Sequence, residues 1–190
     1  ITNNGYISDS GANAISNNGA IGTLTNSGTI IGEYGIANYG SITSIINSST
    51  GLISATSGTN LYNVGSISAI TNNGTVRSSG YAAIYNAVRG SGTITVQGFI
   101  GAVTNSGLIS GGTAIYNAGT IGTINNSGTI QGTVKAESGG VITPETFTVA
   151  GIGVSNDLGA TIGQLINSGV ISGHTAIFNA SSIGTLNNSG

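Results

Sequence analysis

The sequence predicts an all-β chain that folds as a single-stranded right-handed parallel β-helix, a solenoid with about 21-residue coils and Asn ladders. Three observations predict it. A half-unit of the form apolar-x-Asn-x-Gly-x-apolar recurs along the chain, β-branched residues recur at set distances from each Asn, and no apolar period near 3.6 residues is present. About eight coils stacked at ~4.8 Å would form a rod roughly 40 Å long.

The repeat consists of two alternating series of half-units. A second-series start is usually followed by a first-series start 9 residues later, and the return step is most often 12 residues, so 9 plus 12 gives the basic period of 21. The first series starts at Ile1, Leu24, Ile45, Ile70, Val103, Ile124, Leu165 and Leu186. The second series starts at Ile15, Ile36, Leu61, Ile84, Ile115, Val154 and Ile177.

An Asn follows every one of these starts by two residues, and we expect the fifteen Asn residues to stack in two structural ladders. The amide both donates and accepts, so successive side chains one strand spacing apart can bond along a column and to turn backbone. The Gly that usually follows is expected to give the turn a residue with positive φ. The first ladder would contain Asn3, Asn26, Asn47, Asn72, Asn105, Asn126, Asn167 and Asn188. The second would contain Asn17, Asn38, Asn63, Asn86, Asn117, Asn156 and Asn179.

Apolar residues predict the core of the solenoid. A β-branched residue often stands six positions after a half-unit start, and such residues suit a half-buried pleated surface. These residues are Ile7, Ile30, Val76, Ile109, Ile130 and Ile171 in the first series, and Ile21, Ile42, Ile67, Ile121 and Ile183 in the second. A small residue often precedes the second-series start, which indicates a tight corner that points inward. These are Ala14, Gly35, Ala83, Ala114, Gly153 and Ala176.

Other repeat architectures fit less well. A leucine-rich repeat would have one Asn in each repeat and a helical or extended convex segment, and a left-handed hexapeptide helix would have a strict period of six. Calcium-binding nonapeptide repeats need a recurrent Asp, whereas only Asp9 and Asp157 occur. Helical repeats are disfavoured because Gly and β-branched residues fill the chain.

Two departures from the period predict insertions in one solenoid domain that covers residues 1–190. The first lies at about residues 88–100, and the second at about residues 131–153. The second contains Pro144, Lys135, Glu137 and Glu145, and its alternation predicts a β-hairpin or a local pair of strands.

Composition excludes several functions. Only 4% of the residues are charged and the net charge is −2, so we expect no nucleic-acid partner and no electrostatic attraction to an anionic membrane. Cys is absent, which rules out disulfides and thiolate metal sites and suits export through an oxidising space. No apolar run is long enough to span a bilayer, and no cofactor is expected.

The repeats, such as the segment from Ala114 to Ile130 (AIYNAGTIGTINNSGTI), resemble the passenger repeats of Gram-negative autotransporters, including adhesins and self-associating members. The resemblance covers the whole chain apart from the two insertions. It implies a right-handed β-helix exported through the periplasm and displayed on the bacterial cell surface. The membrane link would be a C-terminal barrel that these residues do not include. Both ends of the chain lie within the repeat, and we therefore interpret it as a fragment of a longer passenger.

Chemistry-bearing side chains are few and scattered, so we expect no catalytic or metal site and no enzyme activity. His174 stands alone beside Gly173 and is interpreted as an exposed turn residue, because no second His exists. Glu137 and Glu145 share one insertion and are interpreted as solvated charges. The competing hypothesis is a carbohydrate-active β-helix enzyme with its site between residues 88–100 and 131–153.

An aromatic stripe is the one candidate surface contact. The residue after the second-series start is aromatic at Tyr62, Tyr85, Tyr116 and, after a break at Ser155, Phe178, and strand alternation turns it outward. The rings form a contact surface for a glycan, a host protein or a sister molecule, or they shield the Asn ladder from water. On the sequence alone we favour shielding.

We therefore expect a structural and interaction module that presents a rod for adhesion or self-association, with a host surface, a glycan or sister molecules as partners. An ice-binding solenoid is a third hypothesis. It is disfavoured because the outward Thr column of the first series (Thr2, Thr25, Thr71, Thr104) is interrupted by Ile46, Asn125, Ile166 and Asn187.

Overall fold

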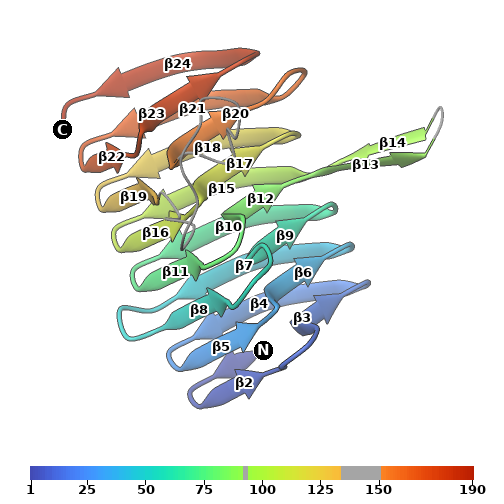
Figure 1. Ribbon diagram of the computed structural model, residues 1–190. Coiled ribbons are helices and arrows are strands. Elements are labelled where there is room, and N and C mark those ends of the chain that lie inside the picture. The colour runs from blue at the N-terminus through green and yellow to red at the C-terminus, as the bar shows by residue number, and fades with distance from the viewer. Residues whose placement is uncertain (92–93, 134–150) are drawn as a thin grey trace, which may run out of the picture.

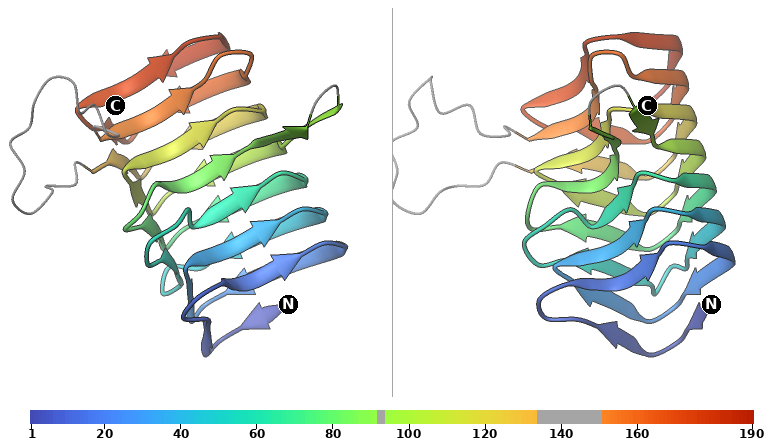
Figure 2. Two further views of the ribbon diagram at one scale, coloured as in Figure 1. Left: turned by 45° about the vertical axis from the view of Figure 1, so that its right-hand side comes forward. Right: turned by 90° about the vertical axis from the view of Figure 1, so that its right-hand side faces the viewer.

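A computed structural model describes residues 1–91, 94–133 and 151–190, and in it the chain forms a parallel β-helix, as the repeat predicts (Figure 1). Three parallel sheets, named A, B and C here, run along the stack, and a coil contributes one strand to each. Figure 2 shows the same stack of coils from two further sides. The described ranges contain no helix, and hence none that is long and apolar enough to cross a bilayer.

The three sheets differ in strand length and in their place in the coil. Sheet A consists of β1 (Thr2–Asn3), β4 (Ala20–Asn26), β7 (Ser41–Asn47), β10 (Ser66–Asn72), β15 (Phe99–Asn105), β18 (Thr120–Asn126), β21 (Thr161–Asn167) and β24 (Ser182–Asn188). Sheet B consists of β2 (Tyr6–Ser8), β5 (Thr29–Gly32), β8 (Leu52–Ala55), β11 (Thr75–Ser78), β16 (Leu108–Gly111), β19 (Thr129–Gly132) and β22 (Val170–Ser172). Sheet C consists of β3 (Asn13–Asn17), β6 (Tyr34–Asn38), β9 (Leu61–Asn63), β12 (Ala82–Asn86), β17 (Thr113–Asn117), β20 (Ile152–Asn156) and β23 (Thr175–Asn179).

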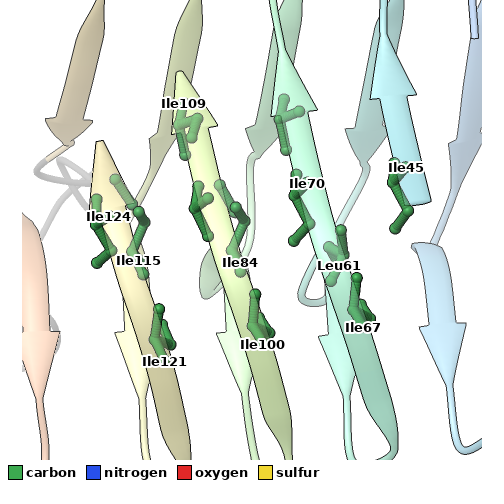
Figure 3. Packing of buried hydrophobic residues seen from close by; sticks show 14 of the residues in the cluster. Ile45, Leu61, Ile67, Ile70, Ile84, Ile100, Ile109, Ile115, Ile121 and Ile124 are labelled. Atoms are coloured by element: carbon green, nitrogen blue, oxygen red, sulfur yellow. The ribbon is translucent and has the colours of Figure 1, made fainter. Parts of the chain in front are cut away.

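The apolar columns form one continuous core between the three sheets (Figure 3). The predicted columns are confirmed: Ile30, Ile42, Ile67, Ile109 and Ile121, for example, are almost wholly buried. At about 1.5–3 kcal/mol for each fully buried side chain, this core is the main source of stability. The spacing missed three core residues: extra turn residues displace Ile53 and Ile162 from the sixth position, and the first insertion displaces Ile100.

The strands of sheets A and C bend, and the bends account for the unusual spacing of inward residues. In β15, Ile100 and Val103 both face the core although they are three residues apart, and the pairing with β10 skips Gly101. In sheet C the pairing of β12 with β17 skips Ala83 and Ala114, so two consecutive side chains of each strand face inward. The inward corner predicted from the small residues is thus confirmed, and it lies within the strands of sheet C.

The turn glycines are required for a reason other than the one expected. The positive-φ glycines of the described residues are Gly151 and Gly159, neither of which is a turn Gly of the repeat, so the prediction of positive φ there was wrong. A Cβ atom on Gly107 would instead lie 2.1 Å from the carbonyl oxygen of Gly74 in the adjacent coil. Turns stack backbone on backbone at one strand spacing, and this leaves no room for a side chain.

The first insertion forms an antiparallel hairpin, β13 (Val88–Ser91) and β14 (Ile94–Gln97), which stands out from the stack (Figures 1 and 2). It joins a strand of sheet C to a strand of sheet A. The second insertion joins β19 of sheet B to β20 of sheet C, so the two insertions leave the coil at different corners. The hairpin predicted within residues 131–153 lies mostly in residues 134–150, outside the described residues.

Candidate functional site

Two continuous Asn ladders run along the solenoid, as predicted. Each Asn Nδ2 donates to the Oδ1 of the Asn in the next coil at 2.7–2.9 Å. The bonds run from Asn3 through Asn26, Asn47, Asn72, Asn105, Asn126 and Asn167 to Asn188. The second ladder runs from Asn17 through Asn38, Asn63, Asn86, Asn117 and Asn156 to Asn179.

Each ladder amide also holds the turn beside it. Asn26 Nδ2 lies 3.1 Å from the carbonyl oxygen of Gly28 in its own turn and 3.2 Å from that of Leu52 in the next coil. Thirteen of the fifteen ladder residues are buried, and Asn179 and Asn188 of the last coil are exposed. Buried amides that satisfy one another in this way are structural groups, and they leave no free polar atom for a ligand.

The candidate contact residues lie on the outer face of sheet C. Tyr62, Tyr85 and Tyr116 occupy paired positions on the adjacent strands β9, β12 and β17. Ser155 of β20 pairs with Tyr116 and interrupts the stripe, and Phe178 of β23 follows Ser155. The structure thus brings the first three residues together, whereas Phe178 lies two strands beyond Tyr116 and is 46% exposed.

Three further tyrosines join the stripe, and together they form what we call the tyrosine cluster. Its members are Tyr34, Tyr39, Tyr62, Tyr81, Tyr85 and Tyr116, whose neighbouring ring centroids lie 4.9–6.3 Å apart. The rings meet edge to face or tilted, an arrangement that aromatic pairs favour. The cluster therefore crosses four strands of sheet C, from β6 to β17.

The rings are not needed to shield an Asn ladder from water. Asn105 and Asn126 of the first ladder have no exposed surface although their outward neighbours are Thr104 and Asn125. Asn26 of the first ladder is equally buried beside Thr25. Because these residues of the first ladder are fully buried beside Thr and Asn, an Asn ladder needs no aromatic cover, the shielding interpretation is not supported, and another role is needed for the partly exposed rings.

Arg89 adds a positive charge to one end of the tyrosine cluster. It lies on β13, yet its guanidinium carbon is 5.7 Å from the centroid of the Tyr39 ring, a residue that follows β6 two coils earlier. The hairpin thus directs a cation back over the face of sheet C, a favourable cation–π geometry. Beside it is a surface groove of about 540 Å³, named the Arg89 groove here, lined by Gly11, Ala12, Asn13, Glu33, Tyr34, Tyr39, Tyr62 and Arg89.

At the other end of the cluster, the Tyr116 hydroxyl donates to the Asp157 carboxylate in the loop after β20. Burial raises the pKa of Tyr116, and the hydrogen bond to Asp157 raises it further. Burial is also the largest cause of the raised pKa values of Tyr62, Tyr81 and Tyr85. These four phenols are therefore neutral at physiological pH, and their hydroxyl groups can both donate and accept hydrogen bonds.

The remaining chemistry-bearing residues lie apart from one another. Arg77 is exposed on sheet B, where its Nε donates to Ser54 Oγ at 3.3 Å, and His174 is exposed between β22 and β23, as expected for a turn residue. In the part of the chain that the structure describes, no three His, Cys, Asp or Glu side chains gather as metal ligands would. Glu137 and Glu145, the acids of the competing enzyme hypothesis, lie outside the described residues.

The outer face of sheet A has the broken Thr column that the sequence predicts. Thr2 pairs with Thr25, but Thr25 pairs with Ile46, and Thr104 pairs with Asn125. Ice-binding faces need a regular array, and this column does not supply one.

Sequence reasoning found half of the tyrosine cluster and missed the rest. Tyr34, Tyr39 and Tyr81 lie outside the repeated position, although all three stand within three residues of a second-series start, which was an available signal. Arg89 had no such signal, because its place depends on the path of the hairpin.

Comparisons with known proteins do not assign the chain to a family. No protein-family model, no curated protein and no solved structure matches it.

Proposed function

We propose that this chain is an interaction module of a bacterial surface protein, a rod that presents its tyrosine cluster for adhesion or self-association and has no catalytic activity of its own. The observation that carries the proposal is the cluster itself. Six partly exposed tyrosines gather on one face of sheet C, whereas the Asn ladder of sheet A is buried without such cover.

The composition of this face supports a contact role. Tyr and Arg are the residues that most often anchor contacts between molecules, because each combines a large surface with a polar group. Tyr39 and Tyr81 each expose 37% of their surface, and Tyr34, Tyr62, Tyr85 and Tyr116 are partly exposed beside them. A partner would therefore find adjoining aromatic rings here, whereas the outer face of sheet A carries Thr, Asn and Ile side chains.

The rod is suited to contacts that add up along its length. A core and two ladders that are continuous from coil to coil stiffen the stack, so groups on one face keep their spacing. Several weak contacts on such a face would combine into a strong one by multivalency. The partner would be a host surface, a glycan or a sister molecule.

Surface display is part of the same proposal. The repeats resemble autotransporter passengers, and the absence of Cys suits export through the periplasm to the cell surface. A solenoid of low charge held mainly by local, coil-to-coil contacts is also well suited to folding progressively after export.

The test compares two faces of the same coils. Beads that carry the chain are expected to cluster or to attach to host-cell layers, and the double substitution Tyr62→Ala and Tyr85→Ala should abolish either behaviour. The matched control is Thr71→Ala with Thr104→Ala, a pair on adjacent strands of the outer face of sheet A. Circular dichroism checks that both variants fold. Beads that neither cluster nor attach, or a tyrosine variant that behaves like the parent, would refute the proposal.

A further inference from the structure

The Arg89 groove combines aromatic, cationic and anionic groups in a way that the rest of the described surface does not. Tyr34, Tyr39 and Tyr62 supply ring surface, Arg89 supplies a donor fork, and Glu33 supplies a carboxylate. No Leu, Ile, Val, Phe or Met lines it. Its volume of about 540 Å³ is within the usual range of small-molecule sites, roughly 300–1,000 Å³.

The lining argues against an apolar peptide as the occupant. An amphipathic peptide lays its apolar side chains into a hydrophobic groove, and this groove instead offers aromatic faces edged by polar groups. Its charges also argue against an anionic or cationic ligand. Arg89 and Glu33 contribute one charge of each sign, so a charged ligand that pairs with one of them meets the other as a like charge.

A neutral sugar suits both the aromatic faces of the groove and its two opposite charges. The C–H face of a pyranose ring can stack on a tyrosine ring, while its hydroxyl groups donate to the Glu33 carboxylate and accept from the Arg89 guanidinium. The neutral Tyr62 phenol, whose pKa is raised first by burial and then by Tyr39, can serve in either role. We infer that the Arg89 groove is a binding site for a neutral oligosaccharide.

The arrangement of the tyrosine cluster indicates how a longer chain of sugars would lie. From Tyr62 the rings continue through Tyr85 to Tyr116 along successive coils. A saccharide seated on Tyr39 and Tyr62 would therefore extend along the axis of the solenoid, with further units over the next rings. Arg89 holds one face of Tyr39 and thereby orients that ring at the end of the track. The inference rests on the proposed function, because it names the chemistry of the partner that the same face would bind.

The test is a titration of the full chain with three neutral probes, namely tetramers of glucose with α-1,4 or β-1,4 linkages and a tetramer of N-acetylglucosamine. Binding is followed by NMR of the Arg89 and Tyr39 signals and by tyrosine fluorescence, which is clean because the chain has seven Tyr and no Trp. At least one probe should bind with sub-millimolar or low-millimolar affinity. Arg89→Ala and Tyr39→Ala should each weaken it by about tenfold or more. Arg77→Ala, which removes the other exposed arginine from sheet B, should leave it unchanged.

Each alternative outcome has a definite meaning. If no neutral probe shifts the Arg89 or Tyr39 signals, or if Arg89→Ala binds as the parent does, the inference is wrong. Stronger binding of a sulfated tetrasaccharide or of a proline-rich peptide would assign the groove to another class of ligand. Beads that still attach to glycan-free protein layers while no sugar binds would overturn this inference and leave the proposed function intact. Sugar binding without any adhesion or clustering would overturn the proposed function and leave this inference intact.

Discussion

The side-chain oxygen of Asn60 occupies the space that a Cβ atom on residue 35 would need. A Cβ built on Gly35 would lie 2.0 Å from Asn60 Oδ1. Asn60 stands in the inward column of small residues of sheet C, between Gly35 and Ala83 of the neighbouring coils, and it has no exposed surface. Its Nδ2 donates to the carbonyl oxygen of Ile53 at 2.8 Å, while within the described residues no group donates to its Oδ1. A larger residue at 60 is accommodated because residue 35 has no side chain.

This relationship predicts strong coupling between the two positions. Gly35→Ala alone should lower the free energy of unfolding by about 1–3 kcal/mol, because the new methyl group collides with Asn60. In the Asn60→Ala background the same substitution should cost less, since the remaining close neighbour of the new Cβ is Ile53 Cγ2 at 3.2 Å, the end of a side chain that can shift. Urea denaturation of the four proteins measures the coupling energy, expected to exceed about 1 kcal/mol. Additive effects would mean that the two side chains do not compete for one space.

The middle of an Asn ladder should be far more sensitive than its end. Asn105→Ala leaves Asn72 Nδ2 without its acceptor and Asn126 Oδ1 without its donor. Each is buried, so the substitution should cost about 2–5 kcal/mol. Asn188→Ala at the exposed end of the same ladder is the matched control and should cost less than about 1 kcal/mol. Equal effects in chemical denaturation would show that the ladder contributes no more in the interior than at the surface.

Stacked turns predict that Gly→Ala lowers stability at a turn glycine but not at a glycine that faces open space. Gly107→Ala places a methyl group against the Gly74 carbonyl, where only backbone could move, and should destabilise the chain by at least about 2 kcal/mol. Gly22→Ala on β4 meets open space, with no atom within 4 Å of the new Cβ, and should be neutral or slightly stabilising. Thermal melts of the two variants check the difference. Similar melting temperatures would remove steric stacking as the reason for the turn glycine.

The tyrosine cluster predicts a loss of stability at high pH. The pKa values of Tyr62, Tyr81, Tyr85 and Tyr116 are raised in the folded chain, chiefly by burial, so folding favours the neutral phenols. Their contribution is complete below the unfolded-state pKa of about 10 and is lost as the pH rises through the folded-state values. Absorbance of tyrosinate and denaturation curves at increasing pH measure both effects.

The same tyrosine titration separates the effect of Asp157 on the pKa of Tyr116 from the effect of burial. Asp157→Asn removes the carboxylate that accepts from Tyr116, so it should lower the pKa of Tyr116 toward its ordinary value while burial still raises it. Asp9→Asn is the control, because Asp9 Oδ1 accepts from the backbone N–H groups of Gly11 and Ala12 and has no such bond to a tyrosine. If Asp157→Asn left the tyrosine titration unchanged, the hydrogen bond would not influence Tyr116.

The sequence by itself determined the coil, the ladders and the core, because the residues that form them mostly stand at a constant distance from each half-unit start. Asn105, Asn126 and Asn167 bond to one another since each follows its half-unit start by two residues, whatever insertion lies between. The outward direction of Tyr62, Tyr85 and Tyr116 follows from strand alternation in the same way.

Only the tertiary structure decided the contacts between residues that stand at different distances from their half-unit starts. Arg89 reaches Tyr39 because the first insertion places its long side chain near a ring two coils earlier, and Asn60 fits against Gly35 because the glycine has no side chain. The tyrosine cluster and the Arg89 groove arise from such contacts. Their geometry depends on the path of loops between coils and on the space that neighbouring side chains leave, and neither is encoded by the period of the repeat.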